Sequence, residues 1–86
     1  MSNFVGGSAY AMARDIAEGF VLLNTSVLKK FSPAELALLR RELERAQTEI
    51  RGDQPPANDI QAIQKRGRKI SRISSAMLVL DTYRKR

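Results

Sequence analysis

The residues best suited to chemistry in this sequence are cations that cluster in its last third. Residues 65–72 contain five basic residues and no acidic residue, and three more basic residues end the sequence. Lysine and arginine side chains at this density neutralise phosphate groups, which is how most proteins hold a nucleic-acid backbone. The predicted nucleic-acid-binding residues are Lys65, Arg66, Arg68, Lys69, Arg72, Arg84, Lys85 and Arg86.

The same cations have a second interpretation, in which they are solvated or contact acidic groups of the protein itself. On a helix, four of them (65, 68, 69 and 72) share one face, because they follow one another at helical spacing. No aromatic residue interrupts the cluster, which disfavours stacking on the bases of single strands. Contact with the backbone of a duplex or a folded RNA fits the cluster better, and RNA is favoured over DNA.

Catalysis and metal binding are not expected. The sequence has no histidine and no cysteine, so it lacks the commonest general base, the thiol nucleophile and the two commonest transition-metal ligands. Most carboxylates alternate with arginines instead of forming an isolated pair in an apolar setting. The sequence therefore predicts a non-catalytic protein without a metal, a cofactor or a small-molecule substrate.

The elements that position the cations begin with one apolar stripe. Ile16, Phe20, Leu23 and Val27 recur at steps of three and four residues, which is typical of an amphipathic helix. The pattern predicts a helix over residues 9–30, after a flexible lead-in over residues 1–8. Gly19 lies inside this stripe and weakens the predicted helix by about 1 kcal/mol relative to alanine.

The clearest boundary in the sequence is the start of a second helix. Ser32 and Glu35 have the spacing of a capping box, in which the side chain of each residue accepts a hydrogen bond from the backbone N–H of the other. Pro33 occupies the first helical position, where its missing N–H costs nothing. Together with Gly52 as a stop signal, these residues predict a helix over residues 33–51.

A third predicted helix covers residues 59–84, after a turn that Pro55 and Pro56 stiffen. The short turn favours an antiparallel αα-hairpin in which Leu43 lies near Gly67. The predicted fold class is therefore all-α: a three-helix bundle built on this hairpin, with residues 9–86 as a single helical domain.

Part of the sequence resembles a known family. Ser32-Pro33-Ala34-Glu35-Leu36, followed by a hairpin and by Arg68-Lys69-Ile70-Ser71-Arg72-Ile73, is similar to the small helical-hairpin family L-twenty-nine of the large ribosomal subunit. The resemblance implies contact with ribosomal RNA through the later segment. Gly67 and Ser71 depart from the pattern of that family, and a whole predicted helix precedes the matching part.

The charge distribution leads to two functional hypotheses. The formal net charge is +6, and residues 59–86 alone carry eight basic and two acidic residues, which favours an anionic partner. The first hypothesis is a nucleic-acid-associated protein that binds phosphates through the third helix. The alternative is a helical adaptor or structural subunit that docks on an acidic protein or on a second copy of itself. Its predicted partner interface is Ile16, Phe20, Leu23 and Val27.

Binding to an anionic membrane surface is a weaker third option, because aromatic anchors are scarce. No uncharged run reaches the length of about 18 residues that a membrane span needs, and no secretory signal is visible. A cytoplasmic location is therefore expected.

Overall fold

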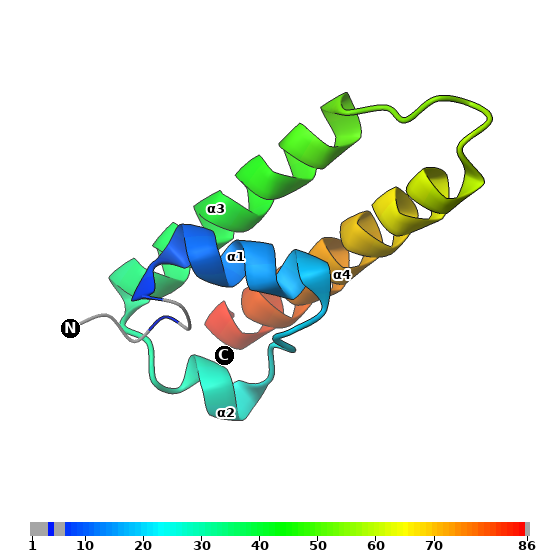
Figure 1. The fold of residues 1–86 in the computed structure, drawn as a ribbon. Helices are drawn as coiled ribbons and strands as arrows, with labels where there is room; N and C mark the ends of the chain where they lie inside the picture. Colours follow the sequence, from blue (N-terminus) through cyan, green and yellow to red (C-terminus); the bar gives the residue numbers. More distant parts are fainter. Residues whose placement is uncertain (1–3, 5–6, 86) are drawn as a thin grey trace.

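The computed structural model describes residue 4 and residues 7–85. Within them the chain forms α1 (Ala9–Glu18), α2 (Thr25–Leu28), α3 (Pro33–Gly52) and α4 (Ile60–Arg84), and no strand (Figure 1). The predicted all-α class is therefore confirmed, with four helices that pack together. Most of the predicted lead-in lies outside the described residues. Its Phe4 is described, and this ring packs on Phe31 with the ring centroids 5.1 Å apart.

The prediction of one helix over residues 9–30 is wrong, because α1 ends at Glu18. Gly19 adopts the left-handed conformation, with a φ of 87°, which glycine reaches without a steric cost. The N–H of Gly19 donates to the carbonyl of Ile16, and the N–H of Phe20 donates to the carbonyl of Asp15. This is the hydrogen-bond pattern of a Schellman motif, which ends a helix. Residues 20–24 follow without regular structure before the short α2 begins.

The predicted start of α3 is confirmed. The Ser32 side chain accepts a hydrogen bond from the N–H of Glu35 at 3.2 Å, and Glu35 Oε1 accepts one from the N–H of Ser32 at 2.8 Å. The end of α3 and the start of α4 each lie within one residue of the predicted position. The Asp59 side chain caps the start of α4. Local capping chemistry therefore determines these boundaries.

The helices α3 and α4 lie side by side, and α1 lies across both (Figure 1). Gln47 of α3 donates a hydrogen bond to Ser74 of α4 at 2.7 Å, and Arg40 lies 2.9 Å from Asp81. The two helices therefore run in opposite directions.

The predicted register between these two helices is wrong. The N-terminal turns of α4 extend beyond the end of α3, so Gly67 does not face Leu43. A Cβ atom added at Gly67 would have no other atom within 4 Å. The pairing lies further towards the C-terminus of α4 because its buried residues begin at Ile73 and pack in the core with α1 and α3. Ile60 and Ile63 consequently remain 66% and 43% exposed.

The buried core lies between α1, α3 and the second half of α4. Met12 and Ile16 of α1, Leu39 and Leu43 of α3, and Ile73 of α4 have at most 2% of their surface exposed. In α4, buried residues begin only at Ile73. Every helix in the described part of the chain is too short or too polar to cross a lipid bilayer.

A pair of leucines on α3 tests this assignment of the core. Leu43 is 0% exposed and Leu38 is 43% exposed. We expect Leu43→Ala to lower the free energy of unfolding by about 2–5 kcal/mol, because it leaves a cavity. The matched change Leu38→Ala should cost less than about 1 kcal/mol. Urea unfolding followed by circular dichroism measures both, and equal costs would contradict the assignment.

Candidate binding site

The helix α4 carries the predicted cationic face, but three of its five central cations contact the chain itself. The first is Arg66, which caps the end of α3. Its Nε donates a hydrogen bond to the carbonyl of Ile50 at 3.1 Å, and its Nη2 donates to the carbonyl of Arg51 at 2.8 Å. These carbonyls belong to the last turn of α3, where a cation complements the negative end of the helix dipole.

The other two cations hold the end of α1. Lys69 Nζ lies 3.0 Å from Glu18 Oε1, and Arg72 Nη1 donates a hydrogen bond to the carbonyl of Ala17 at 3.0 Å. The guanidinium group of Arg72 also lies against Gly19, since a Cβ atom added there would be 3.1 Å from Arg72 Cζ. One side of α4 therefore binds the C-terminal ends of two neighbouring helices.

Lys65 and Arg68 remain available to a partner. Both residues are exposed, and neither makes a hydrogen bond or an ion pair with the described part of the chain. At the end of α4, Arg84 and Lys85 are also exposed, whereas Arg86 lies outside the described residues. The structure thus separates the predicted phosphate-binding residues into a group that contacts the chain itself and a group that makes no such contact within the described residues.

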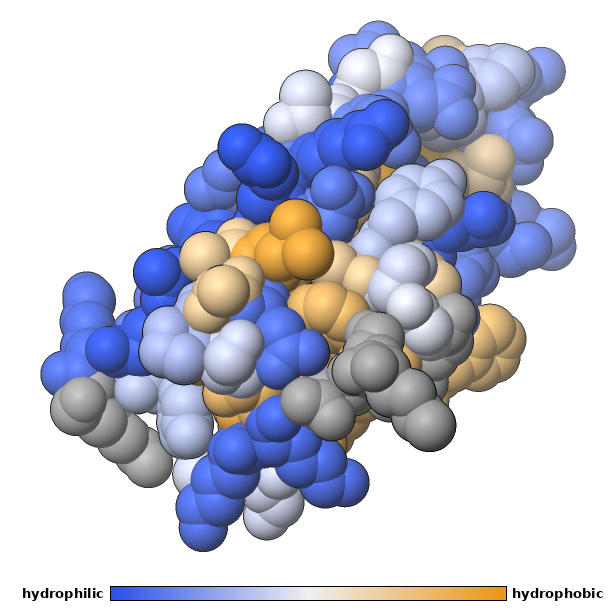
Figure 2. Space-filling model, turned by 90° about the vertical axis from the view of Figure 1, so that its left-hand side faces the viewer, coloured by the Kyte–Doolittle hydropathy of each residue, from blue (hydrophilic) through white to orange (hydrophobic). Residues whose placement is uncertain are grey.

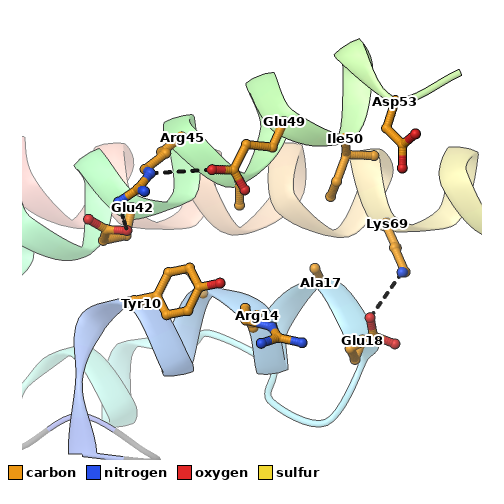
Figure 3. A pocket seen from close by; sticks show the side chains of 12 residues that line it. Tyr10, Arg14, Ala17, Glu18, Glu42, Arg45, Glu49, Ile50, Asp53 and Lys69 are labelled. Atoms are coloured by element: carbon orange, nitrogen blue, oxygen red, sulfur yellow. Dashed lines mark ion pairs between the residues drawn. The ribbon is translucent and has the colours of Figure 1, made fainter.

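A cleft of about 380 Å³ between α1 and α3 gathers charged residues of both signs (Figure 3). Arg45 lies 3.3 Å from Glu49 and 3.8 Å from Glu42, while the Lys69–Glu18 pair closes one end. The ring of Tyr10 lies within about 6 Å of the guanidinium groups of Arg14 and Arg45.

The charges in this cleft largely neutralise one another. Glu42 Oε2 is buried without a hydrogen bond, but Arg45 compensates its charge. The described residues contain no group of three or more residues able to hold a metal ion. Asp53 also lines the cleft, and its carboxylate makes no hydrogen bond or ion pair within the described residues.

On the α3 side of α4, Asp81 pairs with Arg40. The hydrogen bond between them raises the pKa of Arg40 above its ordinary value, and the neighbouring Glu44 acts in the same direction. Both carboxylates therefore favour the charged form of Arg40. The charge of Asp81 is thus already matched within the protein.

A second hollow, also about 380 Å³, lies between residues 19–23 and α4, and we call it the apolar groove. The side chains that line the groove include Val21, Leu22, Ser71, Ser75, Ala76 and Val79, with Arg72 at one end. Most of the groove surface is apolar. Its polar groups are two serine hydroxyls and one guanidinium group, so it offers a binding surface without a catalytic base.

The connection between α1 and α2 presents large side chains beside this groove. Phe20 and Leu22 are 79% and 82% exposed, whereas Leu23 is buried and Val21 is half-buried. This alternation is what an extended backbone produces. The backbone N–H groups of residues 21–23 make no hydrogen bond within the described part of the chain.

The structure divides the residues predicted to form a partner interface. Ile16 and Leu23 are buried in the core of the chain, Val27 is half-buried against that core, and Phe20 alone is well exposed. Sequence reasoning missed Leu22, because on a continuous helix it would lie off the apolar stripe. The signal that could have found it was Gly19, read as the end of a helix.

On the space-filling surface, one face shows a small central area of hydrophobic side chains with hydrophilic side chains around it (Figure 2). Comparisons with protein-family models, curated proteins and solved structures give no match to this chain. The resemblance to the ribosomal family is therefore not supported by the family models. The function has to be inferred from the side chains themselves.

Two arginines one turn apart on α4 test the division of the cations. We expect Arg72→Gln to lower the free energy of unfolding by about 1–2 kcal/mol, because the carbonyl of Ala17 loses a charged donor. Arg68→Gln removes the same charge without a contact and should cost less than about 0.5 kcal/mol. Thermal and urea unfolding of the two variants provide the measurement. Equal stabilities would show that the contact of Arg72 contributes nothing.

Proposed function

We propose that the protein is a non-catalytic helical adaptor that binds another protein through the apolar groove. The observation that carries this proposal is the exposure of Phe20 and Leu22, two neighbouring large apolar side chains beside a groove with apolar walls. Single exposed leucines are normal on protein surfaces. Here two of the most exposed apolar side chains lie two positions apart in the sequence, and one of them, Leu22, lines the groove.

The free energy available at this surface supports the proposal. Burial of a phenylalanine or leucine side chain contributes about 1.5–3 kcal/mol, and neither Phe20 nor Leu22 contributes this to the fold. A partner that covers both side chains therefore gains free energy without disturbing the core. Centrally placed aromatic and aliphatic anchors of this kind dominate many protein interfaces.

The proposed working unit is a hairpin of α3 and α4 braced by α1, which is the three-helix arrangement that the sequence favours. In it, the contact of Arg72 with the carbonyl of Ala17 fixes the end of α1 beside α4. Residues 19–23 leave α1 at this point, so one wall of the groove is tethered to the other. A groove that is formed before binding loses less conformational entropy when a partner arrives.

A pair of leucines gives the test of the adaptor function. We expect Leu22→Asp to reduce recovery of the bound partner at least tenfold, because about 1.5–3 kcal/mol of apolar contact is lost. The control Leu38→Asp changes an exposed leucine that does not line the groove. Each variant is purified from its native cell, and the bound proteins are quantified by mass spectrometry. The proposal requires that at least one bound protein is recovered with the Leu38→Asp variant but not with the Leu22→Asp variant.

Nucleic-acid binding, with RNA favoured over DNA, is the second candidate function. The specific observation behind it is that Lys65 and Arg68 are exposed and unpaired within the described residues. Arg84 and Lys85 add two exposed cations further along α4. These residues would neutralise backbone phosphates with little base readout.

Salt dependence tests this second candidate. If RNA binds, each phosphate contact makes the slope of log affinity against log salt concentration more negative by about 0.9 on a duplex. We expect the double variant Lys65→Gln with Arg68→Gln to make this slope less negative by about 2. Arg41→Gln on α3 is the control for net charge, since Arg41 is exposed and has no partner within the described residues. An unchanged slope in the double variant would rule out phosphate binding by this pair.

A further inference from the structure

We infer that the occupant of the apolar groove is a segment of another protein that carries large apolar side chains and, at one end, acidic side chains. This inference rests on the proposed adaptor function and names the chemistry of the partner. Three properties of the groove support it. These are its size and apolar walls, the hydrogen-bonding groups on its rim, and the sign of the charge at one end.

The size and lining of the groove match a peptide segment. Its volume of about 380 Å³ is near the lower end of the range for ligand pockets, about 300–1,000 Å³. Its walls include Val21, Ala76 and Val79, which have no polar side-chain atom, with the exposed ring of Phe20 next to the wall formed by residues 21–23. Apolar side chains of a partner fill such a hollow.

The rim of the groove offers hydrogen bonds to a peptide backbone. The hydroxyl groups of Ser71 and Ser75 line the α4 wall and lie on exposed residues. On the opposite wall, the backbone N–H groups of residues 21–23 have no partner within the described residues. A peptide that lies in the groove can therefore bond to the serine hydroxyls of the α4 wall.

One end of the groove carries positive charge that the protein does not neutralise. Arg72 lines this end, and Arg68 and Lys65 continue along the same side of α4 at helical spacing. Among nearby acidic groups, Glu18 pairs with Lys69. Asp53 lines a separate hollow with Lys65 and makes no ion pair within the described residues. Like charges at this spacing repel one another by a few tenths of a kcal/mol per pair. Acidic side chains of a partner relieve that repulsion.

The same charge argues against two other occupants. A second copy of the chain would bring another surface of a protein with net charge +6, so like charges would oppose its approach. A nucleic-acid backbone could contact Arg68 and Lys65, but it has no apolar group for the walls formed by Leu22 and Val79. An apolar segment with acidic residues can contact both the apolar walls and the cationic end of the groove. Its acidic end lies towards Lys65, and its apolar residues lie towards Val79.

Selection from a random peptide library displayed on phage tests this inference. The full-length chain is the target, and the Leu22→Asp variant removes peptides that bind elsewhere. We expect the surviving peptides to combine large apolar residues with Asp or Glu on one side. For a synthetic copy of such a peptide, Arg68→Gln should weaken binding about threefold at low salt and less at high salt. Arg41→Gln, which changes net charge equally on α3, should leave the affinity unchanged.

The outcomes separate the inference from the function on which it rests. Groove-dependent peptides without acidic residues, or binding that Arg68→Gln leaves unchanged, would overturn the acidic occupant and leave the adaptor function standing. Failure to obtain any peptide that depends on Leu22 would contradict the adaptor function as well. Sedimentation of the purified chain completes the test. A dimer that Leu22→Asp dissociates would assign the groove to a second copy and overturn the inference.

Discussion

The contact between Arg72 and the C-terminal end of α1 is the interaction on which the rest of this arrangement depends. A helix ends with carbonyl groups that have no partner within it, and here a guanidinium group from α4 donates to one of them. Gly19 leaves room for the contact, because a Cβ atom there would lie 3.1 Å from Arg72 Cζ and the guanidinium group would have to shift. The same glycine ends α1 by its left-handed conformation. One residue therefore ends the helix, makes room for its cap and starts the segment that forms a wall of the groove.

This interaction also changes how a basic helix is interpreted. Cations that cluster on one helix face suggest a surface for phosphates, yet Arg66 and Arg72 of α4 satisfy carbonyl groups of α3 and α1. These side chains add charged donors to the C-terminal ends of α1 and α3, where cap residues already donate backbone hydrogen bonds. In a small protein without disulfides, such contacts between helices add to a thin core.

The sequence was sufficient for the boundaries between α3 and α4 and for the start of α3, which depend on neighbouring residues. The capping box of Ser32 and Glu35 predicted the start of α3, and the start and end of α4 were predicted within one residue. The sequence failed where the outcome depends on contacts between distant residues. Gly19 tolerates a helical conformation and a left-handed one, and the apolar stripe favoured the first.

The register of α3 against α4 failed for a similar reason, since the path of the seven residues between them is not encoded in either apolar stripe. For the candidate site, the sequence identified the exposed cations Lys65 and Arg68 and the exposed ring of Phe20. It could not distinguish them from Arg72 or Ile16, whose contacts come from elements far away in the chain.

The uneven burial along α4 has a consequence for motion. Its first half has no buried residue, whereas Ile73, Ala76 and Leu80 fix its second half in the core. Backbone amides in the first turns are therefore protected from hydrogen exchange by the helix itself and by the contacts of Arg66 with α3, without the core. Amides near Leu80 exchange only when the core opens. Lys65 thus belongs to the part of the helix that opens at lower free energy, while Arg72 and the groove belong to the more stable part.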